Sequence, residues 1–177
     1  MNRIVKIILS IVVIVLIYLV YDSIAGPIRE AAEVERREKA VISGLEKVRD
    51  AELAYKELKG VFTKDWDELI ETMKTGKFKL LIKEGDPDDS TSVLRTDSVF
   101  VSIKDSLFKN FNLDSLPYVP LGEGLKFDLD AGTVMQNNVT VQVFEAKDPK
   151  PYGQIRREEK NPLKVGSMFE ATYSGNW

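Results

Sequence analysis

Residues 4–21 read IVKIILSIVVIVLIYLVY, an apolar stretch in which Lys6 is the one charged side chain. A helix of about 18 residues rises about 27 Å, which is close to the thickness of the hydrocarbon layer of a bilayer. The stretch therefore predicts a transmembrane anchor. The residues that we expect to meet lipid or its interface are Ile4, Ile8, Ile11, Val15, Tyr18 and Tyr21.

The charges around this stretch predict its orientation. Arg3 and Lys6 lie at its start, whereas Asp22 follows it and the next base is Arg29. Because basic residues stay on the cytoplasmic side, we expect a cytoplasmic N-terminus and a periplasmic domain, held at the inner membrane. A signal peptide cleaved after Ala25 is the alternative, since Ser-Ile-Ala fits a cleavage motif. The apolar stretch is longer than a usual signal core, so we expect an uncleaved anchor.

Residues 28–59 are rich in Ala, Glu, Lys, Arg and Leu and predict a helix that continues the anchor. Its apolar residues recur on one face, and charged residues fill the other. The stripe consists of Val34, Val41, Leu45, Val48, Tyr55 and Leu58. We expect a solvated stalk before residue 45 and a packed helix after it. A coiled coil is the alternative, although Glu38 and Glu52 interrupt its second apolar position.

The rest of the chain predicts one short helix and then strands. Apolar side chains with helical spacing fall within residues 63–74, and the Asn137-Asn138 pair suits a tight hairpin. The expected strands are 78–83, 93–103, 126–129, 133–135, 139–146 and 169–173. We therefore expect an α+β fold, in which a transmembrane helix continues into a long amphipathic helix packed on an antiparallel β-sheet. The expected parts are an anchor at 1–25, a stalk helix at 26–44 and a periplasmic domain at 45–177.

Composition excludes several classes of function. The chain of 177 residues has enough apolar material for one core, and its net charge of −3 disfavours nucleic-acid binding. It contains neither histidine nor cysteine, which removes the usual general base, thiol nucleophile and zinc ligands. Asp86, Asp88 and Ser90 have the spacing of a calcium loop, but Thr91 occupies the position of its required glycine. We expect no catalytic, cofactor-binding or metal-binding residues, and no enzymatic activity.

An Asp-Ser pair followed by a small or aliphatic residue occurs repeatedly between residues 89 and 116. The pattern resembles the O-glycosylation sequon of exported Bacteroidota proteins. That resemblance implies glycans on Ser90, Ser98, Ser106 and Ser115. The alternative is that these are ordinary strand-end and cap positions, where Asp and Ser are favoured.

The layout of residues 4–75 resembles that of type IV pilins and pseudopilins. The resemblance lies in the apolar helix that continues into an amphipathic one, in Leu53-Ala54-Tyr55, and in Gly60-Val61-Phe62-Thr63 before a helix that starts near Trp66. Precursors of that family carry a short leader ending in glycine and a glutamate five residues into the mature helix. Neither occurs here, so we expect a permanent anchor. The closing residues 163–177 resemble the endings of single-anchor envelope proteins of Bacteroidota.

Two functions follow from these patterns. The first is a non-enzymatic envelope subunit that presents a pilin-like domain to a secretion or motility assembly. Its expected partners are the membrane, other envelope proteins, or further copies that associate through the transmembrane and stalk helices. The second is a membrane-tethered enzyme or ligand-binding protein that works without histidine or cysteine chemistry.

Overall fold

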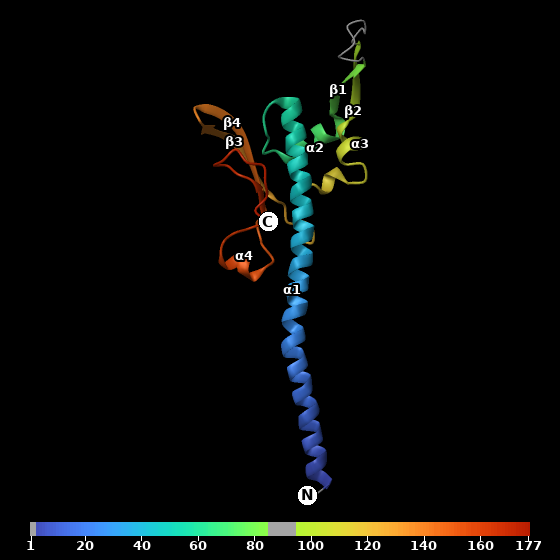
Figure 1. Cartoon of the computed structure of the whole chain (residues 1–177), viewed down its shortest axis with the longest axis vertical. Coiled ribbons are helices and arrows are strands. Elements are labelled where there is room, and N and C mark those ends of the chain that lie inside the picture. Colours follow the sequence, from blue (N-terminus) through green and yellow to red (C-terminus); the bar gives the residue numbers. More distant parts are fainter. Residues whose placement is uncertain (1–2, 85–94) are drawn as a thin grey trace.

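The computed structural model describes residues 3–84 and 95–177 of the chain. It is an α+β protein built on one long helix, α1 (Arg3–Lys59), which runs from the N-terminus into the folded domain without a break (Figure 1). At about 1.5 Å per residue, its 57 residues span about 85 Å. Pro27 lies inside the helix and removes only one backbone hydrogen bond. The predicted continuation of the apolar segment into the domain helix is therefore confirmed.

Short elements follow α1 in two groups. The first group contains α2 (Trp66–Thr75), β1 (Lys77–Glu84), β2 (Arg95–Ser102), α3 (Ile103–Leu107) and the 3-10 turn η1 (Leu113–Ser115). The second contains β3 (Asp128–Gln136), β4 (Val139–Lys147), α4 (Gln154–Glu158) and β5 (Lys164–Gly166). Strands β1 and β2 form an antiparallel pair, and β3, β4 and β5 form a separate antiparallel sheet in that order. In Figure 1 the two sheets lie on opposite sides of α1.

The ends of the first two helices follow from local sequence signals. Gly60 has a φ of 80°, and its N–H donates to the Lys56 carbonyl at 2.7 Å, so α1 stops there. The Asp65 carboxylate then caps α2 by accepting the backbone N–H of Asp67 at 2.9 Å. The predicted helix at 63–74 is confirmed with slightly later bounds.

The core gathers around the C-terminal half of α1. Leu45 and Val48 are fully buried on the helix, and Phe144 of β4 is fully buried against it. The C-terminal segment returns to the same place, because Lys56 Nζ donates to Tyr173 Oη at 2.9 Å and lies 4.8 Å from the Phe62 ring centroid. The long helix is therefore the spine against which both groups of elements pack.

Several strand predictions need correction. The expected strands 126–129 and 133–135 form one strand, β3, since Gly132 continues the ladder opposite Val143. The expected strand 93–103 ends at Ser102, whose Oγ accepts the Asp105 N–H at 3.4 Å and caps α3. Residues 169–173 form no strand, and Phe169 is 82% exposed. Helix α4 and strand β5 were not predicted.

The hairpin between β3 and β4 agrees with its prediction. Asn137 and Asn138 have φ values of 49° and 61°, and Gln136 pairs directly with Val139. Positive φ at both central residues is the geometry of a two-residue type I′ turn, which asparagine tolerates. The turn fixes the register of the two strands on either side of it.

Candidate functional site

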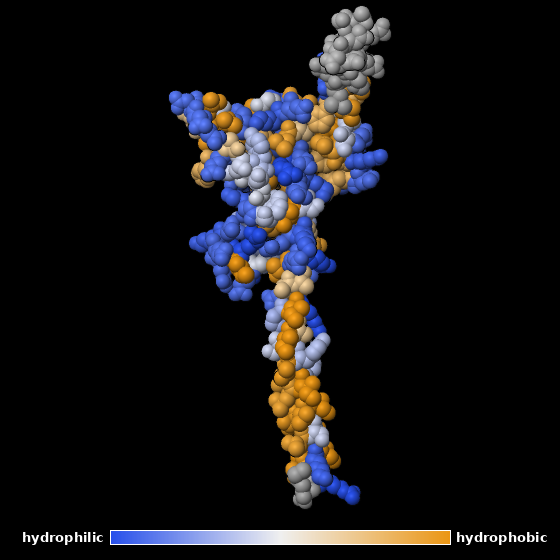
Figure 2. All heavy atoms as spheres, in the orientation of Figure 1, coloured by the Kyte–Doolittle hydropathy of each residue, from blue (hydrophilic) through white to orange (hydrophobic). Residues whose placement is uncertain are grey.

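The N-terminal part of α1 carries an apolar surface that packs against nothing else in the described chain. One helix is long and apolar enough to cross a membrane, and no part of its apolar window is buried. Figure 2 shows this surface as an orange band around the helix, below a mostly blue domain. The six predicted anchor residues are all exposed, with values of Ile4 70%, Ile8 56%, Ile11 56%, Val15 49%, Tyr18 65% and Tyr21 60%. Such a surface is typical of a membrane-spanning helix.

The predicted stripe divides between core and surface. Val41, Leu45, Val48 and Tyr55 are buried. Val34 is half-buried, and Leu58 remains 38% exposed near the end of the helix. Contacts with the domain begin before residue 45, inside the segment expected as a stalk, because the Glu38 side chain pairs with Arg156 of α4 at 2.8 Å.

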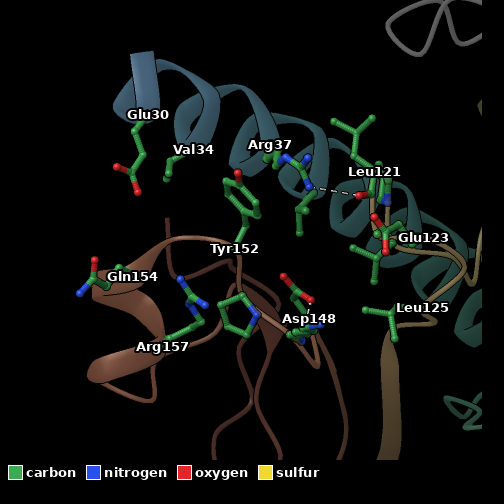
Figure 3. Close-up of a pocket in the computed structure, with 16 residues that line it drawn as sticks. Glu30, Val34, Arg37, Leu121, Glu123, Leu125, Asp148, Tyr152, Gln154 and Arg157 are labelled. Atoms are coloured by element: carbon green, nitrogen blue, oxygen red, sulfur yellow. Dashed lines mark hydrogen bonds between the residues drawn. The ribbon is translucent and has the colours of Figure 1, made fainter. Parts of the chain in front are cut away.

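Arg37 ties the same part of α1 to two loops. Its Nε donates to Glu33 Oε1 at 2.9 Å, and its guanidinium carbon lies 4.0 Å from the centroid of the Tyr152 ring. Its Nη1 also donates to the Leu121 carbonyl at 3.5 Å (Figure 3). Hydrogen bonding to Glu33 is the main reason that the pKa of Arg37 is raised. One side chain therefore holds three segments together.

These segments enclose a cleft of about 340 Å³. One wall is α1, the second is the loop 119–125, and the third is the segment 148–157 (Figure 3). This volume lies at the lower end of the range for small-molecule sites, about 300–1,000 Å³. Charged residues that line it are Glu30, Arg37, Glu123, Asp148, Lys150 and Arg157.

The loop that forms the second wall has a strained backbone. Leu121 and Glu123 have φ values of 60° and 53°, in the left-handed region that such residues rarely adopt, and Gly124 follows at 86°. Each strained residue costs about 1–3 kcal/mol and persists only where surrounding contacts hold it. The Arg37 bond to the Leu121 carbonyl is one of those contacts.

Asp148 lies in the third wall and is only 4% exposed. Its Oδ1 accepts the backbone N–H of Lys150 at 3.0 Å. Burial raises the pKa of this carboxyl, and nearby Asp128 raises it further, while the Lys150 N–H acts in the opposite direction. Within the described residues no cation pairs with it.

A second buried acid lies deeper in the domain, away from the cleft. Glu52 of α1 is fully buried, and its Oε2 accepts the Thr63 N–H at 3.2 Å. Its Oε1 has no hydrogen-bond partner. Burial raises the pKa of Glu52 to about 8. Burial, together with donation of its hydroxyl to Glu68 at 2.6 Å, raises the pKa of Tyr55 to about 12.

The predicted glycosylation serines occupy different elements. Ser98 lies in β2, Ser106 in α3 and Ser115 in η1, and all three are exposed. Ser115 Oγ also donates to the Asn112 carbonyl at 2.6 Å, which is a cap interaction. Ser90 and the acidic turn at residues 86–91 lie outside the described residues.

Sequence reasoning did not find the cleft. Its walls come from segments more than 80 positions apart, such as Arg37 and Leu121, and only folding brings them together. The Asp-Pro-Lys-Pro segment at 148–151 signalled a loop but gave no sign that its aspartate is buried. Glu52 was visible as an interruption of the apolar stripe, which was the available signal for a buried acid.

No group of three or more acidic side chains arranged to hold a metal ion occurs in the part of the chain that the structure describes. The cleft offers carboxylates, guanidinium groups, an ammonium group and a phenol for charge pairing and hydrogen bonding. Comparisons of the chain with protein-family models, with curated proteins and with solved structures found no match.

Proposed function

We propose that this protein is a single-pass, non-enzymatic subunit or accessory of a membrane protein assembly in the cell envelope. The observation that carries the proposal is α1 itself, a single helix whose first part is wholly exposed and apolar and whose last part is the core of the domain. Such a helix fixes the height of the domain above the bilayer, as a subunit of an ordered assembly requires.

The charge distribution supports an orientation with the N-terminus in the cytoplasm. Arg3 and Lys6 lie at one end of the apolar segment, and Asp22 lies at the other. By the positive-inside rule the domain then lies in the periplasm. The arrangement of a membrane helix that continues into a domain helix supports a pilin-like or pseudopilin-like role of the secretion or motility type. The absence of an acidic residue between Ile4 and Tyr21 favours a permanent anchor.

Exposed apolar side chains on the domain provide surface for partner proteins. Phe100 of β2 is 63% exposed and Val99 beside it is 40% exposed, while Leu107 at the end of α3 is 46% exposed. They belong to β2 and α3, two elements that lie toward the end of the molecule opposite the N-terminus (Figure 1). Exposed apolar side chains of this size are available to contribute to an interaction surface.

The test is purification of the full-length protein from bacterial membranes in a mild detergent, after chemical crosslinking in intact cells. We expect co-purification of defined envelope proteins, and loss of crosslinks when Phe100→Ser is introduced. Phe169→Ser, at an apolar position that is 82% exposed and outside β2 and α3, is the matched control. A monodisperse monomer that carries no envelope partner in either form would contradict the assembly role.

The topology has its own test. A protease added to spheroplasts should digest the domain and leave a protected fragment that contains the first part of α1. Full protection of the domain would overturn the proposed orientation, and release of the protein by alkaline carbonate would overturn the anchor.

A further inference from the structure

The cleft between α1, the loop 119–125 and the segment 148–157 is independent of the surface proposed for partner proteins. Its α1 wall includes apolar groups of Val34 and Val41, and Leu125 adds a third from the loop. Charged groups line the remaining sides. A ligand that suits this cleft therefore needs an apolar body as well as charges.

The acidic side of the cleft is built by Asp148 and Glu123. Asp148 is almost fully buried, and Figure 3 shows its carboxylate directed into the cleft, with Glu123 on the opposite loop. Within the described residues Asp148 has no salt-bridge partner, whereas Glu123 is exposed and interacts electrostatically with Arg37. A carboxylate that is buried away from water and has no cationic partner is strongly stabilised by a bound ammonium group.

The basic side is built by Arg157 of α4, which Figure 3 shows beside the cleft near Tyr152. Its guanidinium has no acidic partner among the described residues, unlike that of Arg37, which Glu33 and Tyr152 already engage. A guanidinium offers paired donors that match a carboxylate. The cleft therefore presents unpaired groups of both signs.

We propose that this cleft binds a small zwitterion with an apolar body, in the class of apolar amino acids and dipeptides. The ligand ammonium lies between Asp148 and Glu123, its carboxylate meets Arg157, and its side chain packs on Val34 and Leu125. A simple anion would face Asp148 and Glu123, and a simple cation would face Arg157 and Lys150. A neutral apolar molecule would cover the Asp148 carboxylate and form no hydrogen bond with it.

The first test compares four probes by calorimetry on the full-length protein in a non-ionic detergent. The probes are leucyl-leucine, its N-acetyl form, its C-terminal amide, and free leucine. Because each blocked terminus removes one charge-assisted contact, acetylation and amidation should each weaken binding about tenfold or more. If free leucine binds more tightly than leucyl-leucine, the site is assigned to amino acids. If leucyl-leucine binds more tightly, the site is assigned to dipeptides.

The second test uses variants that remove one charge each. Asp148→Asn should weaken leucyl-leucine about tenfold and leave the acetylated probe unchanged, whereas Arg157→Gln should weaken leucyl-leucine and leave the amide unchanged. Arg36→Gln, an exposed stalk residue whose side chain is 69% accessible, is the matched control and should change nothing.

Two results would overturn the proposal. One is equal affinity for free and blocked dipeptides, which would show that the charges do not contact the ligand. The other is no binding of any of the four probes at millimolar concentration. The comparison of blocked and free probes uses the unmodified chain, so it decides the question even if Asp148→Asn does not fold.

Discussion

Replacing Glu52 by glutamine should change how the stability of the domain depends on pH. The carboxyl is fully buried, its Oε1 has no partner, and burial raises its pKa from 4.5 to about 8. Below pH 4.5 both the folded and the unfolded states hold the proton. Between pH 4.5 and about 8 only the unfolded state is ionised, so rising pH favours unfolding.

The magnitude follows from the same two pKa values. Each pH unit in this window lowers the free energy of unfolding by about 1.4 kcal/mol. The loss reaches about 3 kcal/mol at pH 7 and about 5 kcal/mol above pH 8. A domain of this kind is stabilised by about 5–15 kcal/mol in all, so the effect is a large share of its stability. The contribution of Glu52 is thus fully present below pH 4.5 and is lost as the pH rises through 8.

Glu52→Gln removes the titration and keeps an oxygen that can accept the Thr63 N–H. The amide N–H₂ group of the glutamine has no hydrogen-bond partner. This lowers the free energy of unfolding of the variant by the same amount at every pH. The informative quantity is therefore the difference in unfolding free energy between the variant and the unmodified chain. That difference should rise in favour of the variant by about 1.4 kcal/mol per pH unit from 4.5 to 8.

The assay is urea unfolding of the full-length protein in non-ionic detergent, followed by the fluorescence of Trp66, which packs against the core. Measurements at five or more pH values between 4 and 9 would define the slope. Glu57→Gln, an exposed position on the same helix, is the matched control and should give a flat difference. Parallel profiles for Glu52→Gln and the unmodified chain would refute the reasoning.

Three further changes test the packing of the domain by the same unfolding assay at one pH. Leu45→Ala empties a fully buried position and should cost about 2–5 kcal/mol, and a loss below 1 kcal/mol would mean that α1 does not carry the core. Asp65→Ala removes the cap of α2 and should cost about 1 kcal/mol, with Asp67→Ala as a control on the same turn. Gly166→Ala places a Cβ against the Phe144 carbonyl oxygen at a φ of 77° and should cost about 2 kcal/mol or more, so a neutral result would contradict the geometry of β5.

The apolar segment and the long helix that contains it could be predicted because their signals are local. A segment of membrane length that is apolar on every side is most often found in a bilayer. A charged, alanine-rich segment that ends at Gly60 is most often an α-helix. The Asn137-Asn138 turn was predictable for the same reason, since two residues with positive φ are enough to define it.

The later elements were harder to predict because their structure depends on distant partners. Residues 169–173 have the composition of a strand, but the ladder beside β4 is taken by β5, and Tyr173 instead anchors the segment through its hydroxyl. The division of the strands into two sheets, one on each side of α1, likewise depends on packing. The composition of a segment can favour a strand, but it does not determine which other strand pairs with it.

By itself, the sequence determined that the chain begins with a helix able to span a membrane and that the same helix continues into an α+β domain. Hydrophobicity and helical periodicity are properties of neighbouring residues, so no tertiary information is needed to recognise them. Only the tertiary structure decided which charges lose their water. In the sequence Asp148 looks like an ordinary surface acid and Glu52 is visible only as an interruption of the apolar stripe, yet both are buried in the folded domain. The cleft and the predicted pH dependence of the domain both follow from how the folded segments pack.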